Sequence, residues 1–366
     1  MIKFLSKNLP AFGLDVSSGS FKFMQLAQSG KDVSVKAFSE VILNKGVMQN
    51  DDIADPKMFT AILKKALDNP QYGRIASNYV VASLPESKSF VRVIQIPHMS
   101  ESEAENAVPF EAESFIPMPL DQVYLDWQII GQAQGPQGRD VGSPGEPEKM
   151  NILIIATPKV FVEKYLDILD KAGLKPAALE VESQSCHRAL IPTGSTETSL
   201  LVDMESFRSS MIMVEGGALQ FTSTIPIAGS AFTESIARAL GVSTVKAEEI
   251  KRKVGIANTN EYPNIKTSLL PVLNNLSAEI KNILKFHNEH SAQQVARVVL
   301  LGGSSKLANL PQFLAPQLQE VGIAAVELAN PWQNLPGLKN PPLNVFDSLN
   351  YVTAIGLAER GMRFEA

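Results

Sequence analysis

Three short segments that follow predicted strands combine acidic, small and basic residues in a way that suits phosphate binding. In the first, at 15–22, Asp15 ends one strand and Lys22 returns on the next. Four small residues lie between them: Ser17, Ser18, Gly19 and Ser20. Their backbone N–H and hydroxyl groups could surround phosphate oxygens, and Asp15 could orient Mg²⁺ through water. An ordinary polar hairpin turn is the alternative.

The second segment repeats the first. Asp203 lies 188 residues after Asp15, and at the same offset Ser206 matches Ser18 and the apolar run 211–214 matches 23–26. A repeat of this length indicates two domains of similar build. Two acidic turns that face each other across a cleft could hold one metal–triphosphate between them. A simple hairpin is again the alternative, and Glu205 adds a negative charge that opposes phosphate binding.

The third segment is LLGGSSK at 300–306, where an apolar strand runs into Gly302 and Gly303. Because glycine has no Cβ, the backbone there could approach a flat ligand closely, although such turns also serve packing alone. A helical segment, AEEIKR at 247–252, places Glu248 and Lys251 on one face. Glu248 could accept hydrogen bonds from ribose hydroxyls while Lys251 and Arg252 flank a base. Without the other turns, the pair would be a solvated salt bridge.

Hydrophobic periodicity supplies the elements that must position these segments. The predicted strands are 11–14, 21–26, 33–41, 78–84, 90–96, 123–130, 152–157, 199–203, 209–214, 218–225 and 296–301. The predicted helices are 56–66, 100–115, 159–172, 182–190, 231–240, 244–253, 269–287, 311–321 and 347–360. Ser100 and Glu103 form a capping box at the start of the second of these helices. Residues 131–149 are rich in Gly and Pro and predict a long exposed loop.

Composition restricts the class of protein. The 366 residues suggest two or three units, and the net charge of −5 with a pI near 5.6 gives no basic surface for nucleic acid. The single cysteine cannot form an internal disulfide or build a zinc site alone. No apolar stretch reaches the roughly 18 residues of a membrane span, and no secretory signal is expected. Ile2, Phe4, Leu5 and Leu9 form either a short membrane-touching turn or an ordinary packed one.

Several other residues are expected to have structural rather than functional roles. His287 and His290 have helical metal spacing, but no further ligands complete a site, so a solvated helix end is expected. Cys186 has no convincing base partner and reads as a small core residue. Trp127 and Trp332 are single aromatic residues expected to serve packing.

Together these segments resemble the actin/Hsp70/FtsA nucleotide-binding superfamily, and within it the PilM family of type IV pilus assembly proteins. The matching segments are FGLDVSSGSFKF at 12–23, the stretch 82–127 that begins ASLPESKSF, GLKPAALEVES at 173–183, and LLGGSSKL at 300–307. The stretch 82–127 carries the family-specific part, and the resemblance covers nearly the whole chain. It implies an α/β, actin-like (ribonuclease H-like) fold of duplicated lobes around a nucleotide cleft, with an FtsA-like inserted subdomain.

The resemblance also implies domain boundaries and a set of site residues. The first lobe is placed at 1–85 and 150–198, the insert at 86–149, the second lobe at 199–235 and 296–340, its helix-rich subdomain at 236–295, and a C-terminal helix returning to the first lobe at 341–366. The residues implied to bind ATP are Asp15, Ser17, Ser18, Gly19, Ser20, Lys22, Asp203, Ser206, Gly229, Glu248, Lys251, Arg252, Gly302, Gly303, Ser304 and Lys306. Asp15 and Asp203 would hold Mg²⁺ through water, and Glu182 lies where relatives keep a polar residue near the hydrolytic water.

This chain departs from the family pattern in both phosphate turns. Relatives usually have Asp-x-Gly there, whereas this chain has Ser17 and Glu205 at the glycine positions. A side chain at this point crowds a phosphate, and a carboxylate repels it unless the charge is neutralised. We therefore expect nucleotide binding with at most weak ATPase activity.

The implied function is that of a cytoplasmic protein at the inner face of the membrane, in pilus biogenesis and twitching motility. It would dock the N-terminal cytoplasmic peptide of the membrane protein PilN between the first lobe and the insert, under control of the nucleotide state, and reach the membrane only through partners. Candidate groove residues, which are equally good core positions, are Phe90, Val91, Val93, Phe110 and Phe115. Other proteins of the pilus platform are further expected partners, and a homo-oligomer is also expected. The alternatives are an FtsA-like polymerising protein, for which a C-terminal membrane helix is not expected here, and a small-molecule kinase, for which no general base is evident.

Overall fold

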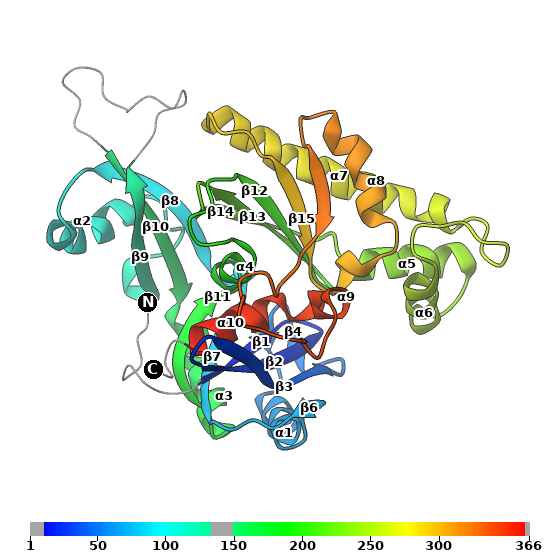
Figure 1. Ribbon diagram of the computed structural model, residues 1–366, viewed down its shortest axis with the longest axis horizontal. Helices are drawn as coiled ribbons and strands as arrows, with labels where there is room; N and C mark the ends of the chain where they lie inside the picture. The colour runs from blue at the N-terminus through cyan, green and yellow to red at the C-terminus, as the bar shows by residue number, and fades with distance from the viewer. Residues whose placement is uncertain (1–10, 133–148, 363–366) are drawn as a thin grey trace.

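Two mixed β-sheets with helices between and around them form the architecture (Figure 1). The computed structural model describes residues 11–132 and 149–362. The predicted N-terminal turn at Ile2, Phe4, Leu5 and Leu9 and most of the predicted loop at 131–149 lie outside the described residues. Within these residues the α/β fold consists of two lobes and of a segment that is inserted into the first lobe.

The first lobe contains a six-stranded sheet in the order β11-β7-β1-β2-β3-β6. Its strands are β1 (Ala11–Val16), β2 (Ser20–Ser29), β3 (Asp32–Ile42), β6 (Tyr72–Gly73), β7 (Tyr79–Leu84) and β11 (Lys175–Val181). All six residues of β1 are buried, because this central strand pairs antiparallel with β2 and parallel with β7. The short pair β4 (Met48–Gln49) and β5 (Asp52–Ile53) lies beside it. Strands β6 and β11 were not predicted from periodicity.

The second lobe repeats this hairpin arrangement. Its strands are β12 (Ser199–Met204), β13 (Ser209–Glu215), β14 (Ala218–Ile225), β15 (Arg297–Leu301) and β16 (Ala325–Leu328). In the first lobe Asp15 pairs with Lys22, and in the second Asp203 pairs with Ser210, so the register repeats at the 188-residue offset. The duplicated build predicted from the repeat is confirmed by the strand pairing.

The insert extends the second sheet. Its elements are η1 (Glu86–Lys88), β8 (Phe90–Pro97), α2 (Glu101–Glu113), η2 (Leu120–Gln122), β9 (Val123–Gln132) and β10 (Lys149–Pro158). Strand β8 meets β14 at the pair Arg92–Phe221, which gives the sheet order β16-β15-β12-β13-β14-β8-β10-β9. The predicted boundary at 149 assigns β10 to the first lobe, but β10 pairs with β8 and β9 along its length. A division that follows the pairing places this boundary after Pro158, and the other boundaries stay predictions.

Helices cover both sheets. One large core joins buried residues of the two lobes, such as Phe12 and Leu201, and further cores lie within the second lobe and within the insert. The helices of the first lobe are α1 (Pro56–Asp68), α3 (Lys159–Lys171) and α4 (Glu182–Leu190). Those of the second lobe are α5 (Gly229–Leu240), α6 (Thr244–Val254), α7 (Ile265–His290), η3 (Gly303–Lys306) and α8 (Leu310–Gln319). The predicted capping box of α2 is present, since Ser100 accepts from the N–H of Glu103 and the Glu103 carboxylate accepts from the N–H of Ser100. Among the described residues, no helix combines the length and apolar character needed to cross a bilayer.

The predicted C-terminal helix at 347–360 is divided into three short helices. They are α9 (Val345–Ser348), η4 (Leu349–Tyr351) and α10 (Val352–Met362). The Leu349 carbonyl accepts a hydrogen bond from the N–H of Gly302 at 3.1 Å. Because this carbonyl is directed to another segment, the regular helical ladder is interrupted there and begins again at Val352.

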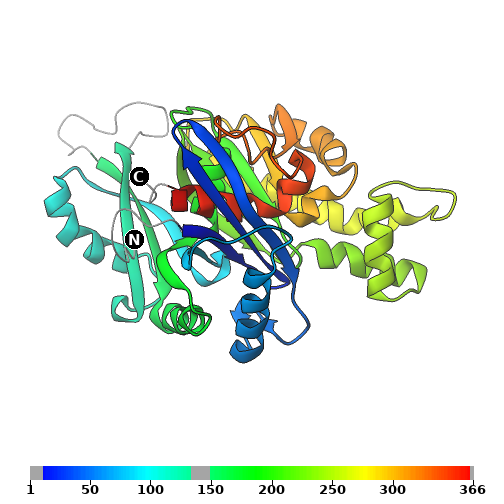
Figure 2. The same cartoon turned by 60° about the horizontal axis from the view of Figure 1, so that its bottom comes forward.

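Helix α10 runs along one face of the first sheet (Figure 2), and glycine allows the two backbones to approach closely. A Cβ added to Gly13 on β1 would overlap backbone atoms of Ala354 and Ala358 on α10. Likewise, a Cβ on Gly356 would overlap the Ser185 carbonyl of α4. Glycine is required at both positions because backbone, which cannot move aside as a side chain can, surrounds the missing Cβ.

Replacing Gly356 by alanine should therefore lower the free energy of unfolding by about 3 kcal/mol, the upper range of the usual overpacking cost. Urea unfolding followed by circular dichroism measures it. Gly303→Ala is a matched control, since its added Cβ would make only ordinary contacts with the Asn350 side chain, at 3.5 and 3.8 Å. Equal stabilities for the two variants would contradict this account of α10 packing.

Candidate functional site

The two acidic turns face each other where the lobes meet. In the first, the N–H of Ser17 donates to the carbonyl of Ser20 at 2.9 Å, and in the second the N–H of Glu205 donates to the carbonyl of Arg208 at 3.0 Å. A Cβ placed on Gly19 would lie 3.3 Å from Oγ of Ser206. The structure thus brings together the two turns that were predicted from the internal repeat.

Lys22 links the two turns. Its Nζ lies 3.0 Å from Oε1 of Glu205 in the second lobe and 3.6 Å from Oδ2 of Asp15 in its own lobe. The lysine is only 2% exposed. Burial disfavours the charged form, but Glu205 and Asp15 outweigh it and raise the pKa of Lys22 above its usual value. The cation predicted for phosphate is thus already paired within the protein.

Asp15 and Asp203, the two predicted Mg²⁺-orienting acids, are both buried at strand ends. Burial raises the pKa of Asp15 to about 7, with Glu182 and Glu205 adding to the shift and Lys22 opposing it. Burial followed by the nearby Glu205 and Glu182 also raises the pKa of Asp203. Oδ1 of Asp15 accepts a hydrogen bond from Ser83 at 3.1 Å. These carboxyl groups repel each other's charge and would gain from a cation between them.

The third turn meets the second at the carbonyl of Glu205. This oxygen accepts from Oγ of Ser304 at 2.8 Å and from the N–H of Gly229 at 3.1 Å. Gly302 has a φ of +81°, and a Cβ there would overlap Asp203 and Met204. The predicted residues of the second and third turns therefore form one connected group.

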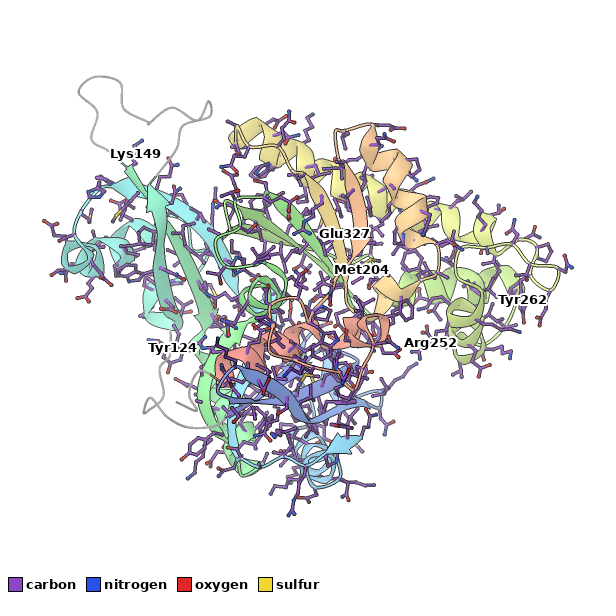
Figure 3. The ribbon with its side chains drawn as sticks, in the orientation of Figure 1. Tyr124, Lys149, Met204, Arg252, Tyr262 and Glu327 are labelled. Carbon is purple, nitrogen blue, oxygen red and sulfur yellow. The ribbon has the colours of Figure 1, made fainter. Side chains whose placement is uncertain are left out.

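The predicted ribose and base residues on α6 occupy different environments. Nζ of Lys251 donates to the Gly229 carbonyl at 3.0 Å and to Thr233 at 2.9 Å, and forms a 2.7 Å ion pair with Glu248. Hydrogen bonds from Lys251 and Thr233 outweigh the effect of burial and lower the pKa of Glu248 to about 2. Arg252 is exposed and bonds Glu248 at 2.9 Å (Figure 3). Lys251 thus anchors α6 to the start of α5, while Arg252 is accessible from outside.

Ser18, Ser20 and Lys306 complete the predicted set of site residues. Ser18 donates a hydrogen bond to Asp51, and Ser20 is buried in the first turn. Nζ of Lys306 donates to the Asp347 carbonyl at 3.3 Å and lies 5.4 Å from the centre of the Phe346 ring. Phe346 is half exposed.

The space beside Gly303 suits the nucleoside part of a ligand. A Cβ on Gly303 would meet only the amide group of Asn350, with Oδ1 at 3.5 Å and Cγ at 3.8 Å. This oxygen is buried and has no hydrogen-bond partner among the described residues, while the amide nitrogen of Asn350 donates to Glu40 at 2.9 Å. An unpaired buried acceptor is costly, and an amino or hydroxyl group of a ligand would satisfy it. The residues present therefore fit the nucleoside end of a nucleotide.

A second ion network, which the sequence analysis missed, lies beside the phosphate turns. Arg208 donates to both carboxylate oxygens of Glu182, at 2.9 and 2.7 Å, and forms an ion pair with Asp51. The carboxylate of Glu182 also accepts from the N–H of Glu86 at 3.0 Å. Glu182, predicted near the hydrolytic water, is thus held by a cation from the other lobe. Arg208 could have been found as the only base within the second turn, 203–208.

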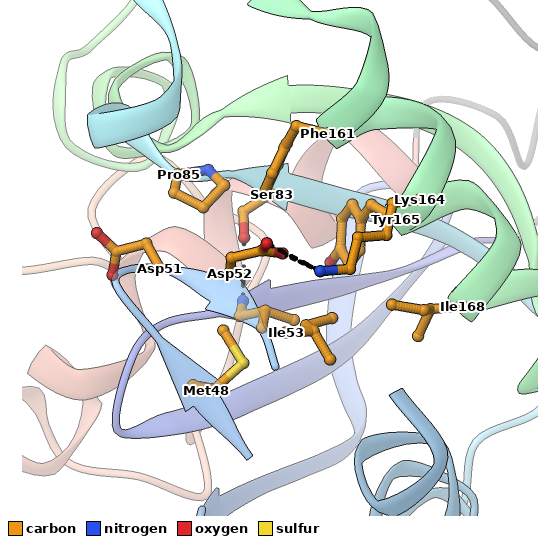
Figure 4. Close-up of a pocket in the computed structure, with 11 residues that line it drawn as sticks. Met48, Asp51, Asp52, Ile53, Ser83, Pro85, Phe161, Lys164, Tyr165 and Ile168 are labelled. Carbon is orange, nitrogen blue, oxygen red and sulfur yellow. Dashed lines mark hydrogen bonds and ion pairs between the residues drawn. The ribbon is translucent and has the colours of Figure 1, made fainter. Parts of the chain in front are cut away.

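A small hollow lies behind the first turn, within the first lobe (Figure 4). It is lined by Asp51, Ser83 and Tyr165 among others, and Lys164 bonds both oxygens of Asp52 at 2.8 Å beside it. The hydroxyl of Tyr165 is buried and lacks a partner among the described residues. Neither Gly303 nor Asn350 lines this hollow, so it is separate from the nucleoside side of the site.

A larger hollow, partly open to solvent, lies between the first lobe and the insert. Its walls come from β9 and β10 of the insert and from β7, α3, β11 and α4 of the first lobe. Tyr124, at one wall, lies at the end of β9 next to the first lobe (Figure 3). None of the five predicted groove residues lines this hollow: Val91 is buried, Phe90 and Val93 pack against cores, and Phe110 and Phe115 are exposed.

Metal coordination by side chains alone is not evident in the part of the chain that the structure describes. There, no three His, Cys, Asp or Glu residues gather closely enough to hold an ion. His287 bonds Glu215 at 2.7 Å, and Nδ1 of His290 contacts its own helix at the carbonyl of Phe286. Cys186 is buried 3.4 Å from Thr353.

The raised pKa of Asp15 predicts a pH-dependent stability difference. Because the folded state holds this proton up to about pH 7, ionisation of Asp15 destabilises the fold as the pH rises from about 4 to about 7. Asp15→Asn should raise the free energy of unfolding by about 4 kcal/mol near pH 8, with the gain vanishing below about pH 4. Unfolding curves across this range test it. Asp52→Asn, in a partly exposed ion pair, serves as the control, and a gain independent of pH would contradict the assignment.

Comparison with known proteins gives one family. A family model described as "Type IV pilus assembly protein PilM" matches residues 13–362. A solved PilM-PilN type IV pilus biogenesis complex is 26% identical, with a TM-score of 0.78, and the match covers 97% of this chain and 99% of that one. MreB5 of Spiroplasma citri bound to AMPPNP shares the fold, at 11% identity and a TM-score of 0.53, over 96% of this chain and 95% of that one.

Among curated proteins, cell division protein FtsA of Bacillus subtilis is 21% identical over 280 residues, which are 69% of this chain and 60% of the FtsA length. The chain thus spans less than two thirds of that relative. The neighbours share the actin-like fold of duplicated lobes that the repeated hairpins build. The chain belongs to the PilM family of type IV pilus assembly proteins.

Proposed function

We propose that this protein is an ATP-binding component of the type IV pilus assembly platform that docks the cytoplasmic N-terminal segment of PilN. The docking site is the larger hollow, between the first lobe and the insert. That hollow is the observation that carries the proposal, and the likeness to a PilM-PilN complex supports it. The protein would work at the inner face of the cytoplasmic membrane, held there by its partner.

The walls of this hollow suit an extended peptide. Strand β9 is the last strand of one sheet and β11 the last strand of the other, and no described strand pairs with the outer side of either. An added strand could therefore form main-chain hydrogen bonds with one of these edges. Apolar side chains at the walls, including Leu125, Ile155 and Leu179, would receive alternate side chains of the peptide.

Ile155→Glu should weaken peptide binding at least about tenfold, because a carboxylate would be buried against the apolar side chains of the peptide. The measurement is fluorescence anisotropy with a labelled peptide of the PilN cytoplasmic N-terminus from the same organism. Ile129→Glu, on β9 but away from the hollow and 38% exposed, is the control. Equal affinities for the two folded variants would place the peptide elsewhere.

The nucleotide would lie between the lobes, with its nucleoside beside Gly303. Asn350 would accept from it, Glu248 and Arg252 would lie along its ribose and base, and the first two turns would face its phosphates. Asp15 and Asp203 would hold Mg²⁺ through water, and the ion would neutralise charge on the phosphates. Similar folds solved with AMPPNP and ADP support this assignment.

Efficient hydrolysis is not expected from this arrangement. Glu182 is the candidate to orient a water, but both its oxygens accept from Arg208 and one also accepts from the N–H of Glu86. These bonds fix the direction of the carboxylate and occupy much of its acceptor capacity. We infer a protein that uses nucleotide to set lobe closure and partner affinity, with at most slow turnover.

Gly303→Ala should lower the affinity for Mg·ATP at least about fivefold, since the added methyl group takes the space proposed for the nucleoside. Isothermal titration calorimetry with Mg·ATP measures this. Because the same variant is expected to keep its stability, loss of binding would not reflect unfolding. Gly217→Ala, a turn residue of the second lobe with φ +76°, provides a control for general strain. Unchanged ATP affinity in Gly303→Ala would overturn the proposed position of the nucleoside.

A further inference from the structure

We propose that the Glu205 side chain takes the place of a ligand phosphate between the lobes. The chain then closes on itself without nucleotide, and a phosphate-bearing ligand has to displace Glu205 from Lys22. The inference rests on the proposed nucleotide binding and concerns how that site is regulated. It is carried by contacts across the lobe boundary.

The first contact is the buried ion pair. Oε1 of Glu205 accepts a hydrogen bond from Nζ of Lys22 at 3.0 Å, and Lys22 is 2% exposed. Carboxylate and phosphate oxygens bind an ammonium group in the same way, through short charge-assisted hydrogen bonds. In the internal repeat, Glu205 occupies the position that Ser17 has in the first turn. At this position of the repeat the second turn carries a carboxylate, whereas the first turn carries only a hydroxyl group.

The other end of the same turn makes a second link, in which the second lobe supplies the cation and the first lobe the anions. Arg208 reaches into the first lobe and binds Glu182 and Asp51. One turn, 205–208, therefore sends an anion to Lys22 and a cation to a pair of carboxylates. Both links are largely buried, so separating the lobes would leave charges without partners in a poorly solvated region, which is costly.

The ion pairs hold the turns in direct contact. A Cβ on Gly19 would lie 3.4 Å from Cβ of Ser206, which is close to the usual separation in a disulfide. A phosphate group cannot enter between turns at this distance, so its binding requires them to part. The Glu205 carbonyl remains bonded to Gly229 and Ser304, which keeps the turn attached to the second lobe.

Cross-linking tests the closed state directly. The double variant Gly19→Cys with Ser206→Cys, in the full chain, should form a disulfide readily under mild oxidation without nucleotide. The buried Cys186 is shielded from the reaction. Adding Glu205→Gln should slow the cross-link at least about fivefold, because the charged link to Lys22 is lost. Glu249→Gln, in an exposed pair with Lys246, is the matched control and should leave the rate unchanged.

Affinity measurements test whether Glu205 competes with a ligand phosphate for Lys22. Glu205→Gln should bind Mg·ATP at least about tenfold more tightly than the unchanged protein, since no carboxylate competes for Lys22. Adenosine, which has no phosphate, should bind both proteins equally. The cross-link in the unchanged background should slow when Mg·ATP is added.

Two results would overturn the proposal. A cross-linking rate in Glu205→Gln equal to that of Glu249→Gln would show that Glu205 does not hold the turns together. Equal Mg·ATP affinities with and without Glu205 would show that it does not compete with phosphate. If Mg·ATP binds neither protein, nucleotide binding itself fails together with the stand-in role, while the cross-linking result still decides whether Glu205 closes the lobes.

Discussion

The ion pair between Lys22 and Glu205 is the interaction on which the arrangement of the two lobes depends. Lys22 lies on β2 of the first lobe, and Glu205 lies in the turn between β12 and β13 of the second lobe. A buried lysine requires an anion, and the nearest candidate in its own lobe, Asp15, is 3.6 Å away and has a raised pKa. The second lobe supplies the closer partner, so the charge balance of the site is complete only when the lobes are together.

Close backbone packing of the C-terminal helices supports the site. Helix α10 lies against β1 at glycine positions, and the segment just before it receives the N–H of Gly302. The C-terminal helices thereby connect the first acidic turn, at the end of β1, with the third turn of the other lobe. A change at any of these turns is transmitted through backbone contacts, which deform little, to the others.

The insert connects the same site to the hollow proposed to receive the peptide. Its sheet continues that of the second lobe through β8 and β14, while its outer strand β9 lies across the large hollow from β11 of the first lobe. A movement of one lobe relative to the other would therefore alter the spacing of the two edge strands. This geometry gives lobe closure a physical route to peptide affinity.

The sequence by itself determined the repeated hairpins, the acidic and glycine turns, and most helices and strands, because strand periodicity, caps and turn residues act over a few positions. It did not predict β11, the break before α10, or the residues of the large hollow. The pairing of Lys22 with Glu205, 183 positions away, and of Arg208 with Glu182 was decided by tertiary structure alone. Local rules say which side chains carry charge, but only the folded chain decides which charges lose water together and must pair.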